Sequence, residues 1–142
     1  MLKNAVFLVE DNADDELLIV SSLKAANLDN EIVVARDGAE ALDYLFATGE
    51  YADRAPELPV VVLLDLKLPK IGGLEVLRRI RADERTKLLA VIVLTSSDED
   101  TDVVESYRLG ANSYVQKPVN FGEFSAAIQK LGLYWLLLNK IP

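Results

Sequence analysis

The sequence predicts an α/β fold in which a doubly wound, five-stranded parallel sheet carries helices on both faces. Five short apolar runs recur along the 142 residues and alternate strictly with segments of helical periodicity. Four of the runs are continuous and rich in Val, Ile and Leu, as in strands that are buried on both faces of a parallel sheet. Strict alternation implies right-handed crossovers, which place helices on both faces. The predicted strands are residues 5–9, 32–35, 60–64, 90–94 and 113–115.

A helical pattern follows each predicted strand. In the last one, Phe121, Phe124, Ile128 and Leu131 recur at intervals of three and four residues, and Gly110 ends the fourth as a natural C-cap. The stretch 48–59, which contains Gly and Pro, is predicted to be a surface loop. Because the last helix extends nearly to residue 142, we expect one domain over residues 1–142. The predicted helices are residues 14–26, 38–47, 74–82, 98–109 and 120–138.

Composition excludes several classes of function. The 15 basic and 23 acidic residues give a net charge of −8, which argues against binding to nucleic acid or to an anionic membrane surface. The sequence has no Cys and no His, so thiolate chemistry, His metal sites and a Ser-His-Asp arrangement are impossible. We see no secretory signal and no apolar run of about 18 residues, and we therefore expect a cytoplasmic protein.

The chemistry-bearing side chains follow the predicted strands. Glu10 and Asp11 follow the first, Asp65 the third, Thr95 the fourth and Lys117 the fifth. The carboxyl ends of parallel strands share one edge of a sheet, where ligands of such folds bind. Three carboxylates there repel one another, a conflict that a hard cation such as Mg²⁺ resolves. Lys117 would neutralise an incoming phosphoryl group, and Thr95 would donate a hydrogen bond to it.

Each of these residues also has an ordinary structural role available. Asp11 and Asp37 are both suited to capping the helix that follows them. The acids at 14–16 and 98–102 are expected to complement helix N-termini. Lys117 and Thr95, taken singly, would be a solvated lysine and a turn hydroxyl. The functional interpretation therefore depends on all of them meeting at one edge.

Four motifs make the chain resemble the receiver domain of two-component response regulators. They are Val-Phe-Leu-Val-Glu-Asp-Asn at 6–12, Leu-Leu-Asp-Leu-Lys-Leu-Pro at 63–69 with Gly72 and Gly73, Val-Leu-Thr-Ser-Ser at 93–97, and Gly-Ala-Asn-Ser-Tyr-Val-Gln-Lys-Pro at 110–118. The resemblance covers essentially the whole chain. It implies the flavodoxin-like (βα)5 receiver fold.

The resemblance also implies roles for individual residues. Asp65 would accept the phosphoryl group, and Lys117 would contact it. Thr95 would be the switch hydroxyl, with Tyr114 as the aromatic partner whose rotamer follows it. The Lys117–Pro118 peptide would be cis, and Lys67 and Ser97 would tune the lifetime of the phosphoryl group. The implied Mg²⁺ ligands are Glu10, Asp11, Asp65 and the backbone carbonyl of Lys67.

Three features resemble stand-alone regulators found beside bacteriophytochrome-type histidine kinases: the Glu-Asp pair, the long 48–59 loop and the Tyr134-Trp135-Leu136 ending. The resemblance implies a stand-alone regulator without an output domain. It would be phosphorylated by a histidine kinase or phosphotransfer protein and would signal through a changed protein-binding surface.

Other functions have less support. A phosphate sink or relay intermediate would use the same chemistry. An enzyme of the carboxylate-nucleophile class usually has an acid two residues after the nucleophile, where this chain has Lys67. A structural module without phosphorylation would not need Asp65, Thr95 and Lys117 together. A P-loop nucleotide site is excluded because its motif is missing.

Beyond Leu131 the apolar residues of the last predicted helix cease to keep to one face. One face can pack on the sheet, and the remainder would form an apolar patch of the kind that marks an interface. We therefore expect a homodimer or partner contact there. The alternative is that the segment folds back over the sheet edge. The predicted contact residues are Tyr134, Trp135, Leu136 and Leu138.

Overall fold

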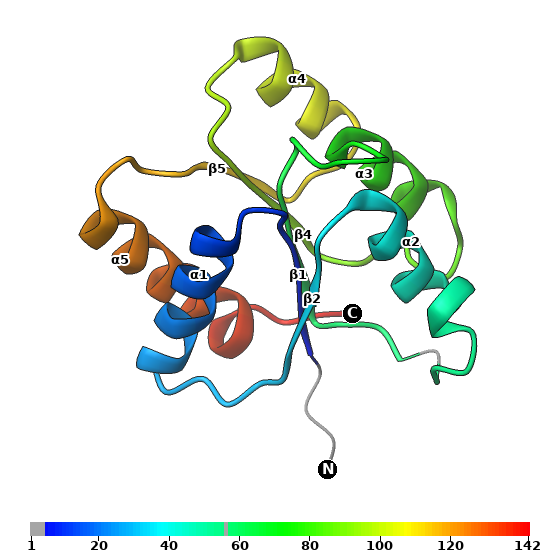
Figure 1. The fold of residues 1–142 in the computed structure, drawn as a ribbon, viewed down its shortest axis with the longest axis horizontal. Coiled ribbons are helices and arrows are strands. Elements are labelled where there is room, and N and C mark those ends of the chain that lie inside the picture. Colours follow the sequence, from blue (N-terminus) through cyan, green and yellow to red (C-terminus); the bar gives the residue numbers. More distant parts are fainter. Residues whose placement is uncertain (1–4, 56) are drawn as a thin grey trace.

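The computed structural model describes residues 5–55 and 57–142 and confirms the predicted fold (Figure 1). Five parallel strands form one sheet in the order β2-β1-β3-β4-β5, which is the flavodoxin-like order. β5 pairs from Ser113 opposite Ile92 to Gln116 opposite Thr95. The strands are β1 (Val6–Val9), β2 (Ile32–Ala35), β3 (Val61–Leu64), β4 (Val91–Thr95) and β5 (Ser113–Gln116).

Helices cover both faces of the sheet, with α1 and α5 on one side and α2, α3 and α4 on the other (Figure 1). Successive strand residues point to opposite faces. Phe7 and Val9 therefore belong to the core beneath α2 and α3, while Val6 and Leu8 belong to the core beneath α1 and α5. The helices are α1 (Ala13–Ala25), α2 (Gly38–Phe46), α3 (Gly73–Ala82), α4 (Asp100–Arg108) and α5 (Phe121–Gly132).

Side-chain caps fix where three of the helices begin. Asn12 accepts a bond from the Asp15 N–H at 2.9 Å and caps α1, so Asp11 is not the cap of this helix. Asp37 caps α2 through the Glu40 N–H at 2.7 Å, as expected. Asn120 caps α5 through Glu123 N–H at 3.1 Å. The caps of α1 and α5 lie beside the sheet edge that carries the predicted site.

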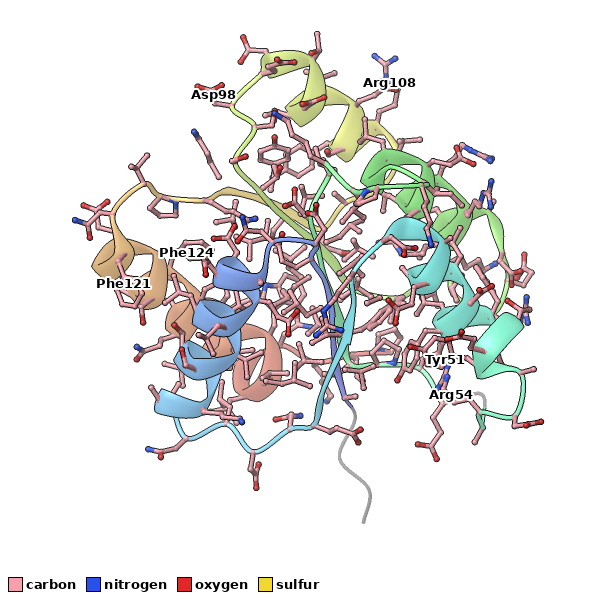
Figure 2. All side chains as sticks on the ribbon, in the orientation of Figure 1. Tyr51, Arg54, Asp98, Arg108, Phe121 and Phe124 are labelled. Atoms are coloured by element: carbon pink, nitrogen blue, oxygen red, sulfur yellow. The ribbon has the colours of Figure 1, made fainter. Side chains whose placement is uncertain are left out.

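The predicted 48–59 loop is an ordered surface feature over its described residues. It contains a 3-10 turn at Gly49–Tyr51. The Tyr51 hydroxyl donates to Glu40 at 2.7 Å. The Arg54 guanidinium lies 4.0 Å from the centre of the Tyr44 ring and donates to the Tyr44 carbonyl. Figure 2 labels Tyr51 and Arg54 on this loop. These contacts attach the loop to α2.

Two expectations need correction. The last helix does not continue as an α-helix over 120–138, because α5 ends at Gly132 and a π-helical segment, Leu133–Leu138, follows. Trp135 and Leu136 of this segment both pack against the core beneath α1 and α5. The described residues contain no cis peptide bond, so the Lys117–Pro118 bond is trans, which is the more stable form of most X–Pro bonds.

None of the helices among the described residues has the length and apolar character needed to cross a membrane.

Gly73 allows α3 to begin directly against the backbone of Asp65 and Leu66. A Cβ atom at residue 73 would lie 2.7 Å from the Leu66 Cα and closer still to the Asp65 carbonyl oxygen. At Gly72 the nearest atom would be the Leu66 carbonyl oxygen at 3.8 Å, which is ordinary contact. The glycine at 73 therefore sets how closely α3 approaches the residue that follows β3.

We predict that Gly73→Ala lowers the free energy of unfolding by about 1–3 kcal/mol, because overpacking against fixed backbone forces the chain to shift. The matched Gly72→Ala variant should stay within about 0.5 kcal/mol of the wild type. Urea denaturation of both variants measures the difference. Equal stability of the two variants would contradict the close approach.

Candidate functional site

The predicted site residues gather where the strands end. Glu10 and Asp11 follow β1, Asp65 follows β3, Thr95 is the last residue of β4, and Lys117 follows β5. In this strand order β1 lies between β2 and β3, and the chain changes direction across the sheet there. Ligands of doubly wound folds bind at such a switch point.

Three carboxylates form a compact cluster at this edge. One oxygen from each of Glu10, Asp11 and Asp65 lies within 4.8 Å of the others. Glu10 is 1% exposed and Asp65 is 6% exposed, whereas Asp11 is open to solvent. The Asn12 N–H donates to Glu10, and the Lys67 N–H donates to Asp65, each at 3.2 Å. These backbone bonds fix two carboxylates whose charges repel.

A buried lysine neutralises part of this charge. The Nζ atom of Lys117 lies 2.6 Å from Glu10 Oε1, 2.8 Å from Asp15 Oδ2 and 2.9 Å from Asp65 Oδ2. An ammonium has three N–H donors, so these three contacts use all of them. The Lys117 side chain is only 7% exposed, and its charge is stable there because every donor meets a carboxylate.

The pKa values follow from burial and from this lysine. Burial is the largest influence on Glu10, and together with the charge of Asp65 it raises the pKa of Glu10 to about 7. Burial would also raise the pKa of Asp65. The hydrogen bond and charge of Lys117 outweigh burial and lower the pKa of Asp65, with smaller contributions from the Thr95 hydroxyl and the Lys67 N–H. Burial alone would lower the pKa of Lys117, but its three carboxylate partners raise it. Asp65 is therefore ionised near neutral pH.

Asp15 is the site residue that sequence reasoning missed. It was assigned only to the charge balance of the α1 N-terminus, yet it is one of the three partners of Lys117. No spacing in the sequence indicated this role, because Asp11 precedes the Asn12 cap and is therefore not a helical neighbour of Asp15.

Thr95 and Tyr114 are connected through hydrogen bonds to Ser97. Thr95 is fully buried, and its Oγ1 accepts from the Ser97 N–H at 3.4 Å. The Tyr114 hydroxyl donates to the Ser97 carbonyl at 2.8 Å, and burial raises the pKa of Tyr114. The Ser97 hydroxyl donates to Asp102 of α4 at 2.5 Å. Ser97 thus joins the end of β4, the Tyr114 ring and the first turn of α4.

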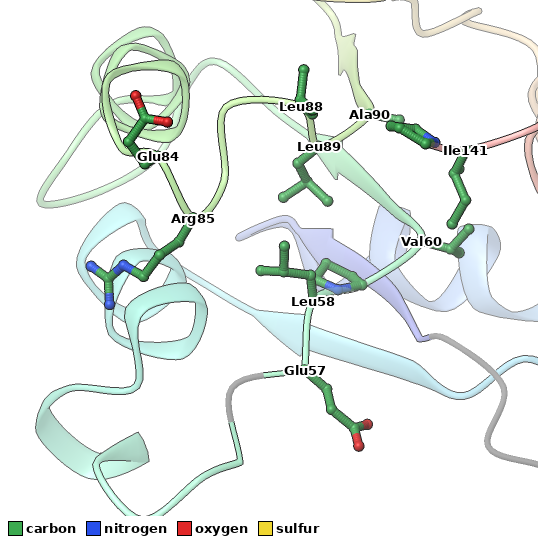
Figure 3. A pocket seen from close by; sticks show the side chains of 11 residues that line it. Glu57, Leu58, Val60, Glu84, Arg85, Leu88, Leu89, Ala90 and Ile141 are labelled. Atoms are coloured by element: carbon green, nitrogen blue, oxygen red, sulfur yellow. The ribbon is translucent and has the colours of Figure 1, made fainter.

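The donor set fits a hard divalent cation. The ligands offered by Glu10, Asp11 and Asp65 are all carboxylate oxygens, and they are the ligand type that Mg²⁺, Mn²⁺ and Ca²⁺ prefer. Lys117 offsets only one of the negative charges in the cluster. A hollow of about 520 Å³ lies at the other end of the sheet from the carboxylate cluster. It is lined by Leu58, Leu88 and Ile141 among others (Figure 3). None of the predicted site residues lines it, so the chemistry belongs to the carboxylate cluster.

Residues 6–129 match the family of response regulator receiver domains. The chain belongs to that family. This response regulator receiver is 37% identical over 137 residues to the response regulator Rcp1 of Synechocystis sp., with 96% of this chain and 92% of Rcp1 covered.

Solved structures of response regulators that match over nearly their whole length have the same fold. The Mn²⁺-bound form of Rcp1 matches with a TM-score of 0.93 at 36% identity, covering 99% of both chains. The phosphorylated cyanobacterial phytochrome response regulator RcpA matches with a TM-score of 0.92 at 38% identity, covering 98% of both. The bacteriophytochrome response regulator AtBRR is 51% identical, with a TM-score of 0.77 and 99% of both chains covered. The predicted resemblance to regulators associated with phytochromes is confirmed by these relatives.

We predict that Lys117→Met lowers the free energy of unfolding by about 3–5 kcal/mol in the presence of a chelator, because it leaves buried carboxylates without their partner. Saturating Mg²⁺ should recover most of this loss, since a divalent cation then neutralises the cluster. Urea denaturation with chelator and with Mg²⁺ provides the two values. Lys67→Met, at an exposed lysine beside the site, is the control and should change little. A loss in Lys117→Met that Mg²⁺ leaves intact would contradict this account.

Proposed function

We propose that Asp65 accepts a phosphoryl group and that the chain acts as a response regulator switch. The observation that carries this proposal is the position of Asp65. It belongs to the carboxylate cluster and also accepts a hydrogen bond from the Lys117 ammonium. Its ionised oxygen would attack the phosphorus of a donor, forming an acyl phosphate while the donor leaves with the electron pair of the broken bond. Lys117 and the Thr95 hydroxyl would then face the new phosphoryl oxygens.

Mg²⁺ is the cation that we propose for the cluster, held by Glu10, Asp11, Asp65 and the backbone carbonyl of Lys67. When bound, it would supply positive charge beside the transferring phosphoryl group. The support is an all-oxygen donor set, one exposed ligand through which a hydrated ion can enter, and a relative, Rcp1, whose solved structure holds Mn²⁺.

The output would leave through α4, β5 and α5. In α4 only Ser106 is buried, and its hydroxyl has no partner among the described residues. This helix, between the labelled Asp98 and Arg108, lies at the margin of the fold (Figure 2). It is therefore attached by polar contacts such as Ser97 to Asp102 more than by apolar packing. Movement of Thr95 toward a phosphoryl group would pull on Ser97, and through it on Tyr114 and α4.

A phosphorylated histidine kinase or phosphotransfer protein is the donor that we propose. A hollow of about 580 Å³ beside Lys117 is lined by Leu17, Val119 and Phe121, which are 70%, 106% and 72% exposed. Large apolar side chains exposed around a charged centre are typical of a docking surface. The phytochrome-associated relatives RcpA and AtBRR support a bacteriophytochrome-type histidine kinase as the partner.

The remaining assignments follow from the same features. We propose a single receiver domain over residues 1–142 that is located in the cytoplasm. We also propose that it binds neither nucleic acid nor membrane, because the net charge is −8. We propose no separate substrate turnover, since exposed Lys67 occupies the position of a second catalytic acid. A phosphate sink is not favoured, because the relatives matched over nearly their whole length, Rcp1 and RcpA, are named as response regulators.

We also propose a homodimer or partner contact at the π-helical segment. Of the residues predicted for it, Tyr134 and Leu138 are 50% and 75% exposed, whereas Trp135 and Leu136 are partly buried and pack against the core. Leu133 and Leu137 add exposed apolar surface at 42% and 66%. The segment therefore folds back with one side and presents the other to a partner.

We predict that a small phosphodonor adds one phosphoryl group to the wild type in Mg²⁺, and none in chelator or in Asp65→Asn. Intact mass spectrometry measures the addition. Asp53→Asn, at an exposed acid of the surface loop, should be phosphorylated like the wild type. A phosphoryl group that persists in Asp65→Asn would remove the support for this function.

We predict that Leu17→Ser and Phe121→Ser slow phosphotransfer from the kinase by about tenfold or more, because loss of a central apolar contact costs about 1–2 kcal/mol or more. The rate with a small phosphodonor should be unchanged, since neither side chain is part of the carboxylate cluster. Leu88→Ser is the matched control, because Leu88 is also 70% exposed but lines the hollow at the other end of the sheet. Equal kinase rates for all three variants would exclude this docking surface.

We predict that Leu138→Glu shifts the protein to the monomer, because a carboxylate in an apolar interface is left unpaired. Sedimentation velocity over a concentration series measures the association. Leu88→Glu places the same charge at an equally exposed leucine outside the segment and should associate like the wild type. If the wild type itself is monomeric at high concentration, the contact is with a different protein.

A further inference from the structure

Lys117 has three carboxylate partners, and only two of them belong to the metal cluster. Glu10 and Asp65 are both cluster members and partners of the lysine, whereas Asp15 is a partner only. Asp15 lies in the first turn of α1, where the Asn12 cap bonds its N–H and fixes its backbone. Its side chain is 29% exposed, against 7% for Lys117.

A cation in the cluster and the Lys117 ammonium draw on the same two carboxylates, those of Glu10 and Asp65. Both Glu10 and Asp65 would turn toward the cation, and the lysine would lose partners in a site where an unpaired ammonium is costly. Of these three carboxylate partners of Lys117, only Asp15 lies outside the cluster that would hold the cation. Its contact would keep Lys117 charged and close to Asp65 while the carboxylates of Glu10 and Asp65 bind the cation instead of the lysine.

We propose that Asp15 is a positioning residue that holds the Lys117 ammonium when a divalent cation occupies the cluster. The inference rests on the proposed metal-dependent function, but it concerns a residue outside the metal ligands. Without Asp15, Lys117 falls back on Glu10 and Asp65 and competes with the cation for both. The expected result is weaker cation binding that arises through the lysine.

The test is Mn²⁺ binding to the full chain, followed by the electron paramagnetic resonance signal of free Mn²⁺. We expect Asp15→Asn to weaken binding about five- to tenfold, in the range of coupling between contacting residues. Asp14→Asn removes the same charge from a neighbouring exposed position and controls for the long-range effect of charge. It should change binding by less than about twofold.

The lysine-free background separates the proposal from a general structural effect. In Lys117→Met, the further change Asp15→Asn should alter Mn²⁺ affinity by less than about twofold, because there is no ammonium to hold. An equal loss with and without Lys117, or equal losses in Asp15→Asn and Asp14→Asn, overturns the proposal. A wild type that binds no Mn²⁺ overturns the proposed metal site itself, which is a different result.

A second measurement is independent of the lysine variant. In the Mg²⁺-bound wild type, the ¹⁵Nζ resonance of the Lys117 ammonium should be visible by NMR because its protons are held in hydrogen bonds. At a Mg²⁺ concentration that also saturates Asp15→Asn, the cation holds Glu10 and Asp65, so the signal should be lost to exchange in this variant and retained in Asp14→Asn. Retention of the signal in Asp15→Asn overturns the proposal whether or not Lys117→Met folds.

Discussion

The structure depends on one buried ammonium and the carboxylates around it. Glu10 and Asp65 are nearly inaccessible to water and come from loops after β1 and β3. Two such charges are tolerated only when a cation shares them. Lys117, from the loop after β5, supplies that cation and thereby ties three strand ends to α1 through Asp15. The position of each loop is therefore fixed by charge as well as by the sheet.

The same arrangement makes the site responsive. Even with its lysine partner, Glu10 keeps a pKa near 7, so burial is only partly compensated. We expect a ligand that adds or redistributes charge here to change the contacts of Lys117, because all three of its partners are carboxylates. The helix best placed to move in response to such a change is α4, because its inner face buries Ser106 where the other helices bury large apolar side chains. Ser97 is hydrogen-bonded to Thr95, to Tyr114 and to Asp102 of α4, so we expect a change at Thr95 to reach both Tyr114 and α4 through it.

Much of the fold could be predicted because the strands are buried on both faces and appear as continuous apolar runs. The π-helical segment after Gly132 could not be predicted, because an inward-facing adjacent pair such as Trp135 and Leu136 also occurs in an ordinary α-helix of this chain, at Leu18 and Ile19. Glu10, Asp11, Asp65 and Lys117 follow strands and were expected to meet. Asp15 was not found, since a helix N-terminus already explains an acid there. Only the direction of a side chain in three dimensions distinguishes the two roles.

The proposed kinase-docking surface around Phe121 and the proposed contact surface of the π-helical segment lie at opposite ends of α5. Phe121 begins the helix beside the site, and Leu138 lies beyond its end. Between them Phe124 and Ile128 are buried against α1, and a Ser22–Ser125 hydrogen bond of 2.9 Å joins the two helices. At Gly132 an added Cβ would meet the Leu28 side chain at 2.5 Å, so α5 is closely packed to its end. A helix fixed in this way transmits little movement. We therefore expect the apolar segment after α5 to be exposed with and without a phosphoryl group on Asp65, and the movement within the proposed α4-β5-α5 output surface to come mainly from α4.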